Sequence, residues 1–146
     1  MALGRAAIAR FAGVMTTTPH ATALDRTDAW SRLRSRSLGR LAVSVDGHPD
    51  IFPVNFLATD DGILIRTEPG TKVDDVVANE NVAFEVDDTA EGSAWSVVVK
   101  GTARRVDDED HLAAARSAAL WAWAPGPKDV FLHIDPTDVT GRLFSR

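Results

Sequence analysis

Cysteine is absent from this chain, which excludes disulfide bonds, thiol nucleophiles and thiolate metal sites. Positive charge is also in short supply: 16 lysines and arginines stand against 21 aspartates and glutamates, so the net charge is −5. Binding of nucleic acid needs a stripe of basic residues, and the sequence has none, so we expect no nucleic acid partner. Because the longest apolar runs have only the length of a strand, we expect no membrane-spanning segment either.

The 146 residues are enough for one domain, and 45% of them are apolar, so a sizeable core can form. The lack of cysteine suits a reducing compartment, and we expect a cytoplasmic protein. Residues 1–24 contain basic residues and no acidic one, as the start of a signal peptide does. Arg10, however, interrupts their apolar stretch, and no clear cleavage site follows. We therefore predict a disordered tail over residues 1–24, with a targeting segment as the alternative, and one folded domain over residues 25–146.

Hydrophobic periodicity predicts a mainly β protein with a few peripheral helices. Asp25 can cap a helix over residues 25–37, and Gly39 is placed to end it. From residue 41 onward, apolar and polar residues alternate as they do in half-buried strands. The expected strands cover residues 41–45, 51–59, 63–66, 82–86, 95–105, 130–134 and 139–144, and two further helices begin near residues 73 and 107.

Tight turns link most of these strands, as at Asp46-Gly47, and short links favour antiparallel pairing. Closing such a sheet into a barrel removes its exposed edges, so a barrel is the expected architecture. Pro53 predicts an edge or a bulge in its strand because proline cannot donate a backbone hydrogen bond. Asp135-Pro136 predicts a break between the last two strands.

Four residues between a strand and a helix form the most informative group in the sequence. Arg66 and Thr67 end a strand, and Thr71 and Lys72 begin a helix after one turn. A guanidinium, an ammonium, two hydroxyls and backbone N–H groups are the donors that bind a phosphate monoester. The alternative is that Arg66 and Lys72 are surface charges paired with nearby acidic residues. A complete G-x-x-x-x-G-K-[ST] loop is missing, so we expect no nucleotide hydrolysis.

Asn55 and several tryptophans are further candidates for a binding site. Asn55 shares a strand face with apolar residues, so we expect its amide to point inward and to bind a ligand or, alternatively, neighbouring backbone. Trp95 and Ser96 face opposite sides of their strand, so only one of them can line a given pocket, and core packing is the alternative for Trp95. Trp121 and Trp123 likewise face opposite sides of a helix.

The histidines give no pattern of a metal site or of a catalytic group. They stand far apart in the sequence without H-x-H or H-x-x-x-H spacing, so we predict no metal site. No G-x-S-x-G motif is present, and no residue stands out as a general acid or base, so the sequence assigns no catalytic residue. The four histidines are His20, His48, His111 and His133.

Seven short pieces of the sequence stand in a characteristic order. They are Gly39-Arg40-Leu41-Ala42, Pro53-Val54-Asn55-Phe56, Ile65-Arg66-Thr67, Gly70-Thr71-Lys72, Asn79, Val82-Ala83-Phe84-Glu85-Val86 and Trp95-Ser96-Val97-Val98-Val99-Lys100-Gly101. Over residues 25–142 this order resembles the pyridoxamine 5′-phosphate oxidase-like FMN-binding split barrels. No single piece is unique to that family, and the resemblance depends on the order and spacing of all of them.

The resemblance implies a split barrel of six to seven mostly antiparallel strands, which forms a homodimer with FMN in a groove between the two chains. It also implies that Arg66 and Lys72 hold the FMN phosphate, with help from Thr67 and Thr71. The residues implied around the isoalloxazine ring are Val54, Asn55, Trp95 and Ser96, with Trp121 and Trp123 approaching from the partner chain.

The end of the sequence departs from the true pyridoxamine-phosphate oxidases. Those enzymes end in a segment with arginine, histidine and tryptophan that grips the substrate phosphate, whereas residues 139–146 here contain no such motif. We therefore expect an FMN-dependent oxidoreductase with another small-molecule substrate, more similar to the branch with nitroimidazole-reductase-like proteins. Two alternatives stay open: a flavin-binding or sensor protein without turnover, and the same fold carrying deazaflavin F420 or haem.

Overall fold

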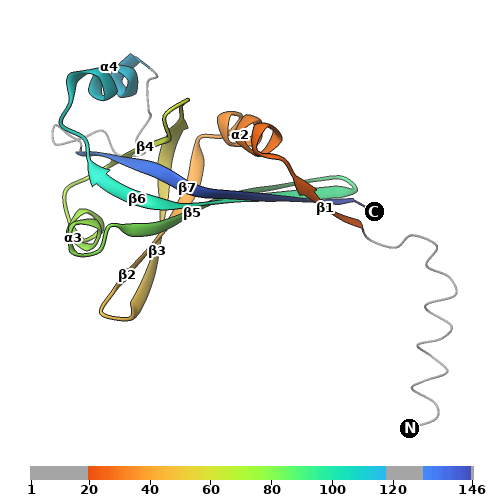
Figure 1. The fold of residues 1–146 in the computed structure, drawn as a ribbon, viewed down its shortest axis with the longest axis horizontal. Coiled ribbons are helices and arrows are strands. Elements are labelled where there is room, and N and C mark those ends of the chain that lie inside the picture. The colour runs from red at the N-terminus through yellow and green to blue at the C-terminus, as the bar shows by residue number, and fades with distance from the viewer. Residues whose placement is uncertain (1–19, 118–129, 146) are drawn as a thin grey trace, which may run out of the picture.

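A computed structural model of the protein describes residues 20–117 and 130–145, which fold into seven strands and three helices (Figure 1). The elements are β1 (His20–Leu24), α2 (Arg26–Arg34), β2 (Leu38–Val45), β3 (His48–Ala58), β4 (Ile63–Thr67), α3 (Thr71–Ala78), β5 (Asn81–Ala90), β6 (Ser93–Arg105), α4 (Glu109–Ser117) and β7 (Val130–Ser145). None of the helices in this part of the chain is long and apolar enough to cross a membrane.

The strands pair only with antiparallel neighbours across the described residues, in the order β1-β7-β4-β3-β2-β5-β6. A further pairing between β6 and β7 joins two members of this order, so β2 to β7 close into a ring, and β1 lies outside it on β7. The expected mainly β barrel of antiparallel strands is therefore confirmed.

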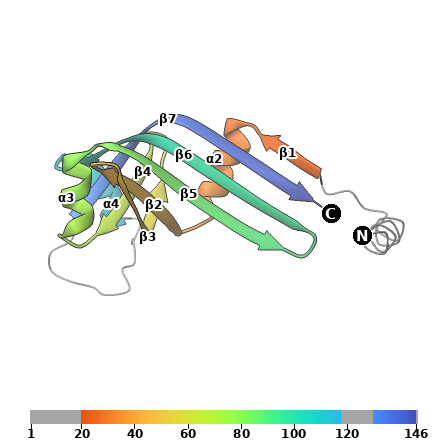
Figure 2. The ribbon, with the colours of Figure 1, turned by 90° about the horizontal axis from the view of Figure 1, so that it is seen from below.

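An arm extends from one side of the ring (Figures 1 and 2). It consists of the far halves of β5, β6 and β7, with β1 along one edge and α2 packed beside it. Because β1 pairs with β7 from His20 to Leu24, the predicted boundary of the disordered tail was wrong for residues 20–24. The sequence HATAL gave no alternation because this edge strand is exposed except at Leu24, which packs on the core. Residues 1–19 lie outside the described residues.

The last strand is continuous, whereas the sequence predicted two strands with a break at Asp135-Pro136. Its register against β6 shifts next to Gly101, which pairs with Pro136, and the additional residue Thr137 binds β6 through its hydroxyl, 3.2 Å from the Lys100 carbonyl oxygen. This bulge takes up the proline without ending the strand.

The start of α2 agrees with the sequence prediction, whereas its end does not. Asp25 caps the helix as expected, since its carboxylate accepts a 2.8 Å hydrogen bond from the Asp28 N–H. The helix ends at Arg34, earlier than expected, and Gly39 belongs to β2 rather than ending the helix. A Cβ atom at Gly39 would lie 2.3 Å from Cζ of Phe84, so glycine is needed there to admit the phenylalanine ring.

The main core fills the ring and continues beneath α2. Phe56 and Phe84 meet edge to face in this core, with ring centroids 4.8 Å apart, and Leu33 of α2 is fully buried in the same cluster. Pro53 lies on a part of β3 that pairs with β2 but precedes the pairing with β4, which confirms the predicted edge position. A second, smaller apolar cluster lies on the other face of the sheet, where α4 covers Leu64.

Candidate functional site

The residues expected to bind phosphate lie where β4 ends and α3 begins. Gly70 precedes α3 with a φ of 154°, and no side chain caps the first turn of this helix. Lys72 extends back over the strand ends, with Nζ 3.4 Å from Oγ1 of Thr67 and 5.4 Å from the centroid of the Phe52 ring. An ammonium group, a hydroxyl and the start of a helix therefore lie together at one end of the barrel.

The charge of Lys72 has no acidic partner in the part of the chain that the structure describes. Its amine instead contacts a hydroxyl and an aromatic face. Glu68, Asp74 and Asp75 are close in sequence but form no ion pair with Lys72 within the described residues. The alternative of a paired surface charge therefore does not hold for Lys72.

Asn55 and Arg66 are direct neighbours across the β3–β4 pairing. Strand alternation points them to the face opposite the main core, while Val54 and Thr67 are buried on the core side. The expectation that Asn55 points inward was therefore wrong with respect to the main core. Arg66 and Asn55 instead share the face of the sheet that carries the α4 cluster, and both are half-buried there.

Six of the nine expected site residues, here called the group around Lys72, lie near the ends of β3 and β4 and the start of α3 in one protomer, with Asn55 and Arg66 on the opposite face of the sheet from Val54 and Thr67. These residues are Val54, Asn55, Arg66, Thr67, Thr71 and Lys72.

Trp95 and Ser96 lie elsewhere, on the arm. Across the sheet they are reached from β3 through β2 and β5, because Asn55 pairs with Leu38, Arg40 with Glu85 and Asp87 with Ser96. Ser96 therefore stands about three strand spacings, roughly 14 Å, from Asn55. Within the described residues, no hydrogen bond, ion pair or ring contact joins Trp95 or Ser96 to Thr67 or Lys72. Trp123, the ninth expected residue, lies outside the described residues, as does Trp121.

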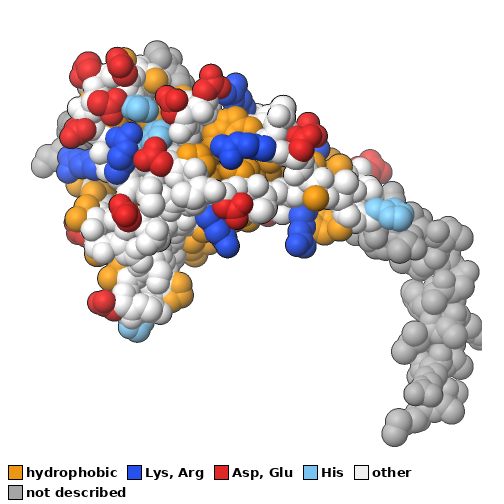
Figure 3. Space-filling model, in the orientation of Figure 1, with side chains coloured by type: hydrophobic (Ala, Val, Ile, Leu, Met, Phe, Trp, Pro, Cys, Tyr) orange, Lys and Arg blue, Asp and Glu red, His pale blue; other side chains and the backbone are white. Residues whose placement is uncertain are grey.

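Trp95 itself packs in the core, which is the alternative that the sequence left open for it. Only 9% of its surface is exposed, and the guanidinium groups of Arg32 and Arg36 lie 5.4 Å and 5.6 Å from its ring centroid. Figure 3 shows basic side chains over an apolar surface in the middle of the molecule, beside α2. Strand alternation places Ser96 on the opposite face from Trp95, where it is half-buried.

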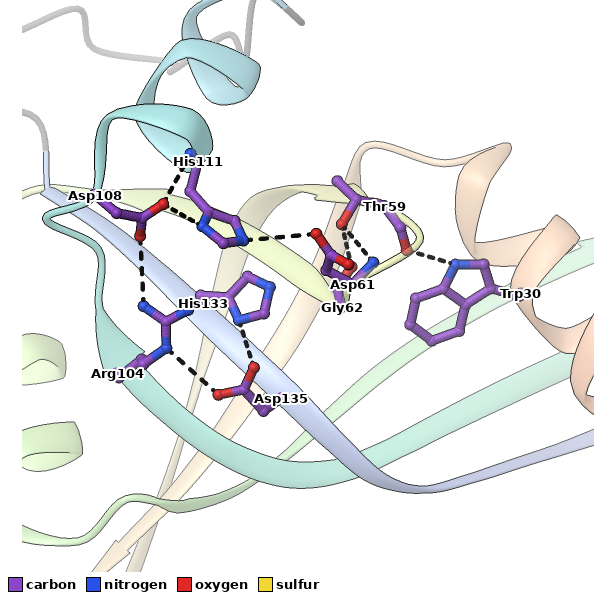
Figure 4. Close-up of polar contacts among 9 residues, drawn as sticks. All are labelled: Trp30, Thr59, Asp61, Gly62, Arg104, Asp108, His111, His133 and Asp135. Carbon is purple, nitrogen blue, oxygen red and sulfur yellow. Dashed lines mark hydrogen bonds and ion pairs between the residues drawn. The ribbon is translucent and has the colours of Figure 1, made fainter.

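A second group of polar residues, not foreseen from the sequence, joins α4 to the sheet (Figure 4). The rings of His111 and His133 meet edge to face, with centroids 4.7 Å apart. His111 Nδ1 lies 2.5 Å from Oδ2 of Asp108, and His133 Nδ1 lies 3.0 Å from Oδ1 of Asp135. Arg104 bridges the two acids, at 3.7 Å from Asp108 and 3.4 Å from Asp135. Since 22 residues separate the two histidines, no spacing motif could have revealed the contact.

Burial and hydrogen bonding shift the pKa values of His133 and Asp108 in this second group. His133 is 1% exposed, and its burial lowers its pKa below the ordinary value of 6.5, against the opposing effect of Asp135. The hydrogen bond from His111 lowers the pKa of Asp108. No set of three or more histidine or acidic residues suited to a metal ion occurs in the two described stretches.

Comparison with known proteins now gives the family. The sequence profile described as pyridoxamine 5′-phosphate oxidase matches residues 25–143, most of the chain. The protein belongs to the pyridoxamine 5′-phosphate oxidase family. One relative is the uncharacterized protein Rv0080 of Mycobacterium tuberculosis, which is 35% identical over 125 residues, covering 81% of this chain and 82% of the relative.

Two solved structures share the fold of this pyridoxamine 5′-phosphate oxidase family member. The FAD binding protein from Mycobacterium smegmatis is 42% identical, with a TM-score of 0.75 over 86% of this chain and 99% of that one. A FAD-binding protein from Mesorhizobium loti is 28% identical, with a TM-score of 0.72 over 84% of this chain and 97% of that one.

In this member of the pyridoxamine 5′-phosphate oxidase family, the donors around Lys72 suit an anion that accepts several hydrogen bonds. A helix start without a side-chain cap offers N–H groups and a positive dipole end, and Lys72 adds a full charge. Thr67 adds a buried hydroxyl. A phosphate monoester has the negative charge and the acceptor oxygens to engage all of them.

Proposed function

We propose that the protein is a flavin-dependent oxidoreductase that binds FMN, with the FMN phosphate at the start of α3. The observation that carries this proposal is the position of Lys72, beside Thr67 and an uncapped helix start and without an acidic partner in the described residues. Similarity to two FAD-binding proteins supports a flavin as the ligand. A bound flavin supplies the electron-transfer chemistry, and its substrate is a small molecule.

The chain's own residues bind and orient the cofactor in this proposal. Lys72 and Arg66 neutralise the phosphate, and the hydroxyls of Thr67 and Thr71 fix its rotation through hydrogen bonds. Asn55 pairs with Arg66 across β3 and β4, and Val54 precedes it on β3, so both are proposed to border the isoalloxazine ring. The Asn55 amide can donate to and accept from the polar edge of an isoalloxazine, which has both kinds of group.

We further propose that the site is completed by a second copy of the chain in a cytoplasmic homodimer. Within the described residues of one chain, the Lys72 ammonium makes no contact with Trp95 or Ser96. A twofold axis can place the arm of one protomer, with Ser96, against the Lys72 group of the other. Trp123 of the partner subunit is proposed to approach the same ring.

A passive flavin-binding protein is the second candidate, because the six expected site residues around Lys72 include no histidine and no acidic residue that could act as a general acid or base. The absorbance spectrum of the purified protein distinguishes the ligands FMN, F420 and haem. Bleaching of a flavin spectrum by a nicotinamide, with turnover, favours the enzyme over the passive binder.

The phosphate position is tested by titrating Lys72→Ala and Arg66→Ala variants with FMN and with riboflavin. Charge-assisted hydrogen bonds are worth roughly 1.5–3 kcal/mol each, so each change should weaken FMN binding by about ten- to a hundredfold. Riboflavin lacks the phosphate, and its weaker binding should stay nearly unchanged. Lys100→Ala, at an exposed position on β6, is the matched control and should leave FMN binding as it is. Unchanged FMN affinity in both site variants would contradict the proposed phosphate site.

A further inference from the structure

The contact between α4 and the sheet combines a small apolar cluster with a buried pair of histidines. Leu64 and Val106 are buried, and Leu112 of α4 packs against them. Beside this cluster, His111 of α4 rests on the ring of His133 from β7 (Figure 4). Because the apolar cluster is small, the protonation state of the histidine pair strongly affects the free energy with which α4 docks on the sheet.

The His133 ring is packed so closely that it cannot move aside. Its ring lies against Gly62, where a Cβ atom would come within 2.9 Å of Cε1 and 3.0 Å of Nε2. Nε2 has no hydrogen-bond partner within the described residues, and Nδ1 is 3.0 Å from Asp135 without the geometry of a hydrogen bond. The buried ring is thus accommodated as an uncharged imidazole.

The charged groups around this ring come from four elements. Asp135 on β7 is the nearest acid, but it also pairs with Arg104 on β6, which opposes a positive charge on His133. Asp108, just before α4, pairs with His111, and Asp61 in the β3–β4 turn lies 3.9 Å from Nε2 of His111. The acids near α4 therefore engage His111, and among residues 20–117 and 130–145 the carboxylate paired with His133 is the one shared with Arg104.

We propose that His111 and His133 form a pH-sensitive latch, which holds α4 against the sheet at neutral pH and releases it on acidification. A proton on His133 leaves two N–H donors and a positive charge in a buried site that offers one carboxylate, already shared with Arg104. Departure of α4 removes His111 from the ring and opens that site to water, which solvates the charge.

The direction of the pH dependence follows from the burial of His133. Because the pKa of His133 is lowered in the docked state, the undocked state binds more protons below pH 6.5, the ordinary value for the group. Docking is therefore complete above 6.5 and weakens as the pH falls. For a single group, the ratio of undocked to docked α4 rises by up to about tenfold per pH unit.

Undocking would expose the face of the sheet on which Arg66 and Asn55 lie, because Leu64 stands two residues before Arg66 on the same face of β4. The latch itself does not depend on any ligand, so it can be tested without one.

The experiment measures the position of α4 directly by spin labelling. The chain has no cysteine, so Ala113→Cys on α4 and Asp138→Cys on β7, both exposed, can be labelled selectively. Pulsed electron paramagnetic resonance should give one narrow distance distribution at pH 7.5 and a second, displaced population at pH 5.0. In a His133→Gln background the displaced population should be lost, whereas His48→Gln in the exposed β2–β3 hairpin should keep the full response.

The same distance distribution at both pH values, or a full pH response in the His133→Gln background, overturns the proposal. If His133→Gln does not fold, the wild-type protein decides the matter. In that case the NMR titration of the His133 ring and the displacement of α4 should share one midpoint. Displacement with a midpoint that differs from that of His133 overturns the proposal as well.

Discussion

At the scale of single residues, Gly62 shows how closely the turn between β3 and β4 is fitted to β7. Its φ is 152°, a conformation that other residues rarely adopt, and a Cβ atom there would lie 2.2 Å from the Ile134 carbonyl oxygen. A side chain at position 62 would therefore strain the backbone and clash with the main chain of β7, which is held in place by its sheet pairings.

Gly62→Ala is expected to destabilise the fold by about 2–4 kcal/mol, from overpacking and backbone strain together. Gly92→Ala is the matched control, because Gly92 also has a positive φ, 77°, but nothing lies within 4 Å of its Cβ position. That control should cost about 1 kcal/mol. Urea denaturation at fixed protein concentration measures both, and an equal loss in the two variants would show that contact with β7 contributes nothing.

The sequence could predict those residues of the candidate site that lie close together along the chain. Thr67 and Lys72 are five residues apart across one turn, so local structure alone brings them together. The direction of Asn55 could not be predicted, because both faces of β3 are covered near it, one by the core and one by the α4 cluster. The contact between His111 and His133 depends on where α4 docks, which no local pattern encodes.

At the scale of elements, turn chemistry predicted better than strand periodicity. Asp46 and Gly47 adopt φ values of 51° and 77°, as the hairpin prediction required, and β2 and β3 meet there. β1 was missed because an exposed edge strand needs no apolar alternation. β7 was divided in two because the bulge at Thr137 allows a proline within a continuous strand.

Removal of residues 1–24 is expected to lower the melting temperature by about 4–12 °C relative to removal of residues 1–19. The longer deletion takes away the five paired residues of β1 and the packing of Leu24, together worth roughly 1–3 kcal/mol, and each kcal/mol shifts the melting temperature by about 4 °C. Differential scanning calorimetry compares the two deletions. Equal melting temperatures would mean that β1 adds no stability to the arm.

At the scale of the whole molecule, the proposed homodimer makes a prediction about mixed subunits. Lys72→Ala weakens one half of the proposed site, and Ser96→Trp blocks the other half. A heterodimer of these two variants has one site with both halves intact and one with both altered. Random exchange of equal amounts should therefore restore FMN binding to about a quarter of the sites.

Neither variant alone should bind FMN tightly, so the recovery on mixing is measured against a low background. Fluorescence quenching of FMN after subunit exchange counts the restored sites. If each site lies within one chain, mixing restores nothing, and the proposed role of the partner subunit fails while the phosphate position stays testable by itself.

β7 pairs with β1, β4 and β6, and its partners lie as far away in sequence as His20, which meets Ser145. All the other described strands are synthesised before it. The ring cannot close on a growing chain until this strand has emerged, so β4, β6 and β1 must wait with unpaired edges. Such long-range pairing slows folding, and the unpaired strand edges promote aggregation. The nascent chain is thus at its most vulnerable just before β7 is complete, and a chaperone that shields open sheet edges would act at that moment.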